Sequence, residues 1–141
     1  MTITDRTKTR HNQAMQKLND FVGSWNGGQT TFEWLDDRDL LLLRQEAPGP
    51  DVPSAVWVIG VDDQAPDTYS MLYSDSRGIS RIYQMSFDDR SWKIWRQAPG
   101  FSQRFTASLS SDGRQMKGAW ETSPDEVNWQ HDFDLTYTRD L

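Results

Sequence analysis

Short stretches in which apolar and polar residues alternate run along most of the chain, and groups of Asp, Ser, Gly and Pro separate them. These turn signals lie at residues 36–38, 47–54, 62–67, 75–78, 88–90, 98–100, 111–114 and 123–126. Short strands at regular spacing with such turns are typical of antiparallel sandwiches and barrels. The pattern therefore predicts an all-β, up-and-down barrel of about nine or ten strands, closed because closure removes the exposed sheet edges.

The N-terminal part follows a helical spacing instead. Ala14, Met15, Leu18, Phe21 and Val22 fall on one helical face, and Gly23 is suited to end the helix. We expect this short helix near one end of the barrel. Residues 1–8 are polar and predict a flexible N-terminus, followed by a single domain over residues 9–141, a usual length for one domain.

Alternation is clearest in the last strand, where one face carries Val127, Trp129, His131, Phe133, Leu135 and Tyr137. We expect this face to point into the barrel. The same reasoning places inside the barrel the sets Tyr69/Met71/Tyr73, Ile79/Arg81/Tyr83/Met85/Phe87, Trp92/Ile94/Arg96, Phe101/Gln103/Phe105/Ala107/Leu109 and Met116/Gly118/Trp120. Four of these inward residues are unusual, because a packed core would have Val or Leu there: Arg81, Arg96, Gln103 and His131.

An inward guanidinium loses hydration, and this cost must be offset by a partner or by water. Glu33 and Glu46 are the candidate internal counter-ions. The functional hypothesis is a lumen that binds a small amphipathic or anionic molecule. Its polar floor would consist of Arg81, Tyr83, Arg96, Gln103 and His131, and its apolar wall of Trp92, Phe105, Trp120, Trp129 and Phe133. The alternative is a water-filled polar network that binds no ligand.

Charge and composition exclude several classes of function. The chain has 15 Lys and Arg against 21 Asp and Glu, a net charge of −6, which repels nucleic acid. It has no Cys, so a thiolate nucleophile, an iron–sulfur cluster and a Cys-based zinc site are excluded, and His11 and His131 are its two imidazoles. We therefore expect no metal site and no resident cofactor.

The N-terminus lacks the apolar segment of a secretory signal, and the longest aliphatic run, Leu40–Leu43, is too short to span a bilayer. We expect a cytoplasmic protein without a membrane span. Residues 40–43 and 55–61 are apolar on both strand faces, so an apolar set must face outward. Either the N-terminal helix or a second subunit should cover this set, and we favour a homodimer.

Segments near the two ends of the chain resemble those of a known superfamily. The segment Phe21-Val22-Gly23-Ser24-Trp25 after a short helix is similar to the Gly-x-Trp opening of lipocalins and other calycins, and the last strand ends in Tyr137-Thr138-Arg139. In calycins a terminal basic residue commonly stacks on that Trp, so the resemblance implies a contact between Trp25 and Arg139.

Further segments, at 32–35, 73–81, 99–105 and 129–137, resemble uncharacterised bacterial calycin-like domains. This resemblance covers residues 21–139 and implies a hollow barrel related in shape to nitrobindin and fatty-acid-binding proteins. Fatty-acid-binding proteins are similar in using internal Arg and Tyr to hold a carboxylate.

Two other functions stay open for the same lumen. A neutral imidazole is a suitable general base, so His131 with Tyr83 could transfer protons in an isomerase, cyclase or dehydratase. The second alternative follows from the resemblance to nitrobindin, which implies haem held by a histidine of a late strand; His131 is the matching residue. The sequence has no Gly-x-Ser-x-Gly motif, and serine nucleophile chemistry is therefore not expected.

Overall fold

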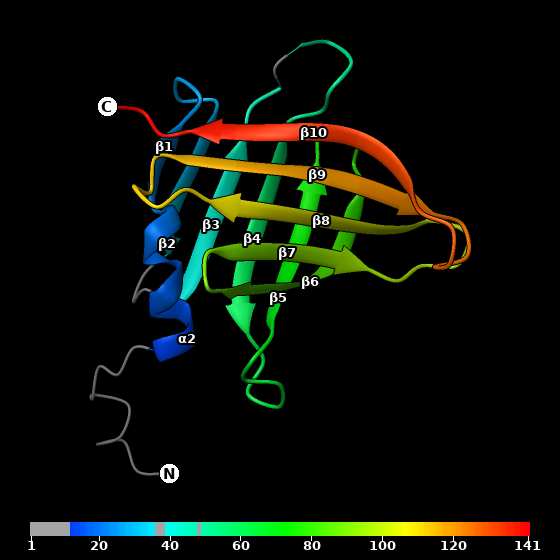
Figure 1. The fold of residues 1–141 in the computed structure, drawn as a ribbon, viewed down its shortest axis with the longest axis horizontal. Helices are drawn as coiled ribbons and strands as arrows, with labels where there is room; N and C mark the ends of the chain where they lie inside the picture. Colours follow the sequence, from blue (N-terminus) through cyan, green and yellow to red (C-terminus); the bar gives the residue numbers. More distant parts are fainter. Residues whose placement is uncertain (1–11, 36–38, 48) are drawn as a thin grey trace.

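A computed structural model describes residues 12–35, 39–47 and 49–141, which form a short helical segment followed by ten antiparallel strands (Figure 1). The helical segment consists of α2 (Gln13–Gln16) and the 3-10 helix η1 (Lys17–Phe21). The strands are β1 (Gly23–Trp25), β2 (Thr30–Leu35), β3 (Leu40–Gln45), β4 (Ala55–Val61), β5 (Tyr69–Asp75), β6 (Ser80–Asp88), β7 (Ser91–Arg96), β8 (Ser102–Leu109), β9 (Gln115–Ser123) and β10 (Gln130–Thr138). The predicted all-β fold is confirmed. The flexible segment expected at 1–8 lies outside the described residues, as do His11 and the turn expected at 36–38.

Every strand pairs with the next one along the chain, and the first and last strands meet. Trp25 and Arg139 form an isolated bridge, and the backbone N–H of Asn26 donates to the carbonyl of Thr138 at 2.8 Å. The sheet is therefore a nearly closed up-and-down barrel. In Figure 1 strands β7 to β10 cross β3, β4 and β5 at a steep angle, as in a flattened barrel.

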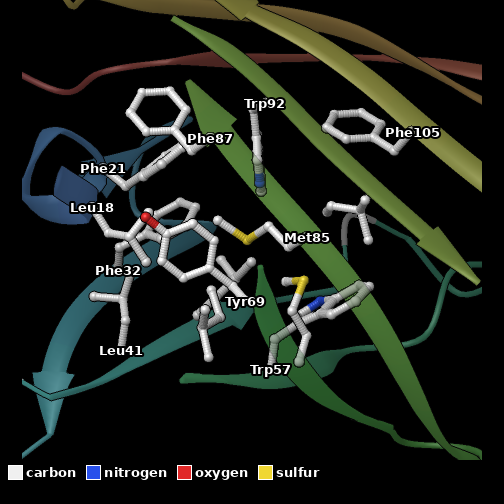
Figure 2. Packing of buried hydrophobic residues seen from close by; sticks show 14 of the residues in the cluster. Leu18, Phe21, Phe32, Leu41, Trp57, Tyr69, Met85, Phe87, Trp92 and Phe105 are labelled. Atoms are coloured by element: carbon white, nitrogen blue, oxygen red, sulfur yellow. The ribbon is translucent and has the colours of Figure 1, made fainter. Parts of the chain in front are cut away.

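Aromatic rings fill the barrel between its helical end and its middle, as Figure 2 shows for part of the core. Ring centroids are 4.9 Å apart for Phe21 and Trp92, 5.1 Å for Trp92 and Phe105, and 5.1 Å for Phe105 and Trp120. The buried residues of strands β5 to β9 confirm that the predicted sets within these strands face inward, whereas Phe101, just before β8, is 43% exposed. This half of the barrel is therefore packed. Its indole rings supply buried apolar area that aliphatic side chains supply in other cores.

The helical segment covers one end of the barrel. Asn12 caps α2 by accepting a hydrogen bond from the N–H of Met15, and Met15, Leu18 and Phe21 are fully buried. Tyr69, at the start of β5, donates its hydroxyl to the carbonyl of Ala14 at 2.5 Å. Because its apolar face is inserted into the barrel end, the helix is a lid on that end and leaves the outer face of the strands uncovered.

Candidate ligand-binding site at the β6–β7 opening

Strands β6 and β7 separate before they reach the end of the barrel that lies opposite the helix. Their pairing runs from Asp88↔Ser91 to Gln84↔Trp95 and stops there. Beyond this point β6 continues to pair with β5 as far as Ser80, and β7 continues to pair with β8 as far as Arg96. The two strands diverge while each stays in its own half of the sheet, so the barrel wall opens between them.

A hollow of about 550 Å³ lies at this opening. Apolar side chains of the outer face line one part of it, and polar side chains near the end of the two strands line the rest. The lining residues are Leu72, Ser80, Arg81, Ile82, Gln84, Trp95, Arg96 and Gln97. The hollow therefore combines aliphatic and aromatic surface with two guanidinium groups and two amides.

Arg81 and Arg96 both line this hollow from inward-facing register positions. Arg81 is opposite Tyr73 on β5, and Arg96 is opposite Gln103 on β8; both arginines are partly buried. Within residues 12–35, 39–47 and 49–141, no carboxylate lies within salt-bridge distance of either guanidinium. Arg81 instead lies 5.7 Å from the ring centroid of Phe101. Two guanidiniums without counter-ions make a positive site on a chain of net charge −6.

Tyr83 and Gln103 form a hydrogen bond on the inner side of the opening. The Tyr83 hydroxyl donates to Oε1 of Gln103 at 2.7 Å. Tyr83 is two residues from Arg81 on the same strand face, and Gln103 is the cross-strand partner of Arg96. Four of the five residues predicted for the polar floor are thus brought together, and the amide of Gln103 keeps its N–H donors for a further partner.

A buried carboxylate next to the opening was not among the predicted site residues. The side chain of Asp75 is 0% exposed; it accepts hydrogen bonds from the Tyr73 hydroxyl at 2.6 Å and from Nη2 of Arg77 at 2.6 Å. The hydrogen bond from Arg77 is the main reason that the pKa of Asp75 lies well below its usual range. Burial, followed by the bond to Asp75, raises the pKa of Tyr73 to about 12.

Asp75 is consequently paired with Arg77 and is not a counter-ion for Arg81. The sequence did contain a signal for it, because Asp75 continues the inward alternation of Tyr69, Met71 and Tyr73. Asp75 is also the first residue of the turn predicted at 75–78, a position where Asp is common in hairpins.

The structure corrects the predicted inward position of His131 and Trp129. A β-bulge lies between His131 and Phe133, so that His131 is opposite Glu121 while Phe133 is opposite the buried Trp120. One extra residue reverses the alternation. The His131 side chain is 58% exposed, with Nε2 2.8 Å from Oδ1 of Asp134. It lies on the outer face, away from Tyr83, and the expected imidazole–phenol pair does not form.

Trp129 also lies on the outer surface. The Arg104 guanidinium lies over its indole, 4.0 Å from the ring centroid, and Nε of Arg104 donates to Oε1 of Glu121 at 2.8 Å. The hydrogen bond from Arg104 lowers the pKa of Glu121. This outer cluster is internally paired, in contrast to the arginines of the β6–β7 hollow.

The predicted apolar wall is divided between core and surface. Trp92, Phe105 and Trp120 face inward and are buried among other rings, whereas Phe133 is 47% exposed. The indole Nε1 of Trp92 is buried and has no hydrogen-bond partner among the described residues. These core rings are part of the packed interior, and the hollow does not include them.

Neither glutamate expected as an internal counter-ion faces the interior. Glu33 lies on the outer face, where Oε1 is 3.5 Å from Nε of Arg44, and Glu46 is exposed. The reason for Glu33 is the turn after β1: Trp25 pairs with Thr30, so the inward parity changes from odd to even residue numbers between the two strands.

Neither the comparisons with known proteins nor the metal-ligating residue types of the chain identify a ligand for this site. No group of three or more His, Asp or Glu side chains that could hold a metal ion is found in the described part of the chain. Among those same residues, no helix is long and apolar enough to cross a membrane. Comparison with protein-family models and with curated proteins found no match to this chain.

Proposed function

We propose that the chain binds a small amphipathic anion at the β6–β7 opening. Arg81 and Arg96 hold the anionic group, and Leu72, Ile82 and Trp95 contact the apolar part. The observation that carries the proposal is that two partly buried guanidiniums without a carboxylate partner line one hollow with exposed apolar side chains. A bound carboxylate would supply the charge and the hydrogen-bond acceptors that both guanidiniums lack.

The anionic group has a second set of partners on the inner side. Arg96 is directly opposite Gln103, whose Oε1 accepts the hydrogen bond from Tyr83. A carboxylate between the two arginines is therefore adjacent to the free amide N–H groups of Gln103. The ligand sits at the wall and not among the core rings, because Trp92 and Phe105 are already in contact there.

Kinship with the calycins is a further part of the proposal. It is supported by the position of the Arg139 guanidinium, 4.2 Å from the ring centroid of Trp25. It is also supported by the up-and-down order of the strands. The homodimer that the sequence favours is likewise a proposal, supported by Leu40, Val56 and Val58, which are exposed or partly exposed on the outer face of β3 and β4.

Ligand binding is tested by titrating the protein with cis-parinaric acid, a fluorescent fatty acid, and displacing it with decanoate or with the uncharged decanol. We expect decanoate to displace the probe much more effectively than decanol. Arg81→Met and Arg96→Met should each raise the dissociation constant at least about tenfold, since a charge-assisted hydrogen bond contributes about 1.5–3 kcal/mol.

Arg44→Met is the matched control, because Arg44 is an arginine of the outer face that pairs with Glu33. It should leave the dissociation constant unchanged. Equal affinities for the wild type and the two hollow variants, with the far-UV circular dichroism preserved, would refute the proposed site.

A further inference from the structure

The hollow at the β6–β7 opening carries an excess of positive charge. None of its described lining residues is acidic, although the whole chain has 21 Asp and Glu against 15 Lys and Arg. Asp75 is a carboxylate close to it along the sheet, two residues beyond Tyr73, which is the cross-strand partner of Arg81. The charge of Asp75 is balanced by its ion pair with Arg77. Arg81 and Arg96 therefore present two positive charges to a ligand.

The hydrogen-bonding capacity of these two guanidiniums is also unused. Within the described residues, the arginines whose side chains donate hydrogen bonds are Arg77, Arg90, Arg104 and Arg139. Arg81 lies over the ring of Phe101, which offers no oxygen acceptor. The N–H groups of Arg81 and Arg96 thus find no acceptor in that part of the chain and are available to a bound anion.

The two guanidiniums reach the opening from different sides. The last paired residues of β6 and β7 are Gln84 and Trp95; Arg96 follows Trp95 directly on β7, and Arg81 lies three residues before Gln84 on β6. A head group between the diverging strands is therefore met from two directions. A carboxylate is planar and offers its oxygens along one edge, which matches one guanidinium fork. The three terminal oxygens of a phosphate monoester are arranged tetrahedrally, so that two forks can bind it at the same time.

The apolar part of the hollow favours a phosphate that carries a hydrocarbon chain over a free phosphate ion. Leu72 and Ile82 are cross-strand partners and are 51% and 57% exposed, and the partly buried Trp95 lines the same hollow. A free phosphate ion would leave these three side chains in contact with water. An alkyl chain would cover them, and each methylene group that leaves water adds to the affinity.

We propose that the ligand of this site is a phosphate monoester of a single hydrocarbon chain. Its head group carries a charge of about −1.5 to −2 at pH 7 and so balances both guanidiniums, whereas a carboxylate or a sulfate monoester balances one. The inference rests on the proposed anion site and narrows its head group. The ligand is a free molecule and not a lipid of an anionic bilayer, because such a surface repels a chain of net charge −6.

Displacement of cis-parinaric acid by decyl phosphate, decyl sulfate and decanoate near pH 8 tests the head group. The three ligands have chains of similar length and differ in the head, and decyl sulfate combines a tetrahedral head with a single charge. We expect the dissociation constant of decyl phosphate to be at least about tenfold lower than that of either other ligand, since an additional charge-assisted hydrogen bond contributes at least about this factor.

Lowering the pH tests whether the second charge of the phosphate causes this preference. A phosphate monoester gains its second proton near pH ~6, whereas a sulfate monoester keeps one charge throughout. Decyl phosphate should therefore lose most of its advantage over decyl sulfate between about pH 8 and pH 5. The titratable and charged groups beside the two arginines are Tyr73, Asp75, Arg77 and Tyr83. Any change in their charge acts on both ligands, so the affinity for decyl sulfate reports it.

Arg81→Met and Arg96→Met test the number of positive charges that the head group meets. Each variant keeps one guanidinium, so the advantage of decyl phosphate over decyl sulfate should fall from about tenfold toward parity. A general loss of affinity cancels in this ratio. Arg44→Met is the matched control, because Arg44 pairs with Glu33 on the outer face, and it should keep the ratio of the wild type. A full phosphate advantage with one guanidinium would refute the proposal.

The remaining outcomes separate the phosphate preference from the anion site itself. Inorganic phosphate should displace the probe only at far higher concentration than decyl phosphate, and phosphatidylcholine vesicles that contain phosphatidic acid should not sediment the protein. Equal potency of inorganic phosphate, or sedimentation with the vesicles, would overturn the single-chain ester. Equal affinities for the three decyl-length ligands, all weakened by Arg81→Met, would overturn the phosphate preference and leave the proposed anion site in place. Displacement by none of them would refute that site as well.

Discussion

The guanidinium of Arg139 lies over the indole of Trp25, with its central carbon 4.2 Å from the ring centroid. Its nitrogens donate to the carbonyls of Val22 at 2.7 Å and Gly113 at 3.0 Å, and also to the carbonyl of Asp20. One side chain thus joins the end of the helical segment, the β8–β9 turn and the last strand. It holds the closure of the barrel beside the isolated bridge between Trp25 and Arg139 and the hydrogen bonds between Asn26 and Thr138.

Replacing Arg139 by Ala should therefore lower the free energy of unfolding by about 2–4 kcal/mol, because it removes a cation–π contact and three charged hydrogen bonds. Arg139→Lys should recover only part of this loss, since an ammonium cannot reach three carbonyls and the ring face together. Urea denaturation measures both values. Lys93→Ala, on the exposed face of β7, is the control; a loss as small as that of this control would contradict the closing role.

Gly118 marks a close approach between β8 and β9. A Cβ atom at this position would lie 2.6 Å from Cβ of Ala107 and 2.6 Å from the carbonyl oxygen of Thr106. Gly118→Ala should therefore force the two strands apart and destabilise the fold by about 1–3 kcal/mol. Gly49→Ala, where a Cβ meets nothing within 4 Å, is the control. Thermal and urea unfolding of the two variants should differ clearly, and equal stabilities would refute the steric argument.

The low pKa of Asp75 predicts that the folded protein loses stability in acid. Because its pKa is lower in the folded protein than in the unfolded chain, its contribution is fully present above the ordinary aspartate pKa of about 4 and is lost as the pH falls below it. The wild type should therefore be more stable than Asp75→Asn at neutral pH, and the difference should shrink below pH ~4. Urea unfolding of both proteins across this range measures the difference.

Arg77→Met tests the cause of that shift, because the hydrogen bond from Arg77 is its largest contribution. An NMR titration should show the Asp75 carboxyl titrating at higher pH in this variant than in the wild type. An unchanged titration would assign the low pKa to other partners of Asp75.

His131 should be dispensable for ligand binding. Its imidazole lies on the outer face of β10 beside Asp134, and the bulge separates it from the hollow. We expect His131→Ala to bind cis-parinaric acid as the wild type does. We also expect ferric haem to give the same Soret spectrum with either protein. A Soret shift that disappears in His131→Ala would show instead that the imidazole ligates haem iron.

Alternation along the strands was sufficient to predict most of the barrel and the inward register of four residues of the proposed polar site. Arg81 and Tyr83 face as expected because β6 pairs with β5 without a bulge, and the same holds for Arg96 and Gln103 in β7 and β8. The separation of β6 from β7 could not be predicted, since it depends on where pairing between two strands stops and not on the pattern within either one.

The predicted inward positions of Glu33 and His131 are wrong because the facing of one strand segment does not continue across a turn or a bulge. For Glu33 the irregularity is the turn after Trp25, in which Asn26 and Gly27 adopt positive φ. For His131 it is the bulge, which leaves the sequence alternation of β10 intact while changing its register. The bulge is not visible in the order of apolar and polar residues, whereas the alternation of Phe32, Glu33 and Trp34 within β2 does indicate an outward glutamate when that strand is considered by itself.

The bulge in β10 changes the numbering of the strand and not the surface that the strand presents. Asp132 is the one residue that β10 has in excess over β9 between the His131↔Glu121 and Phe133↔Trp120 pairs. Deleting it would leave both pairs as they are, with His131 on the outer side and Phe133 on the inner side. A chain without Asp132 would therefore offer the same residues to solvent on an unbroken ladder, which makes this position tolerant of a change in chain length.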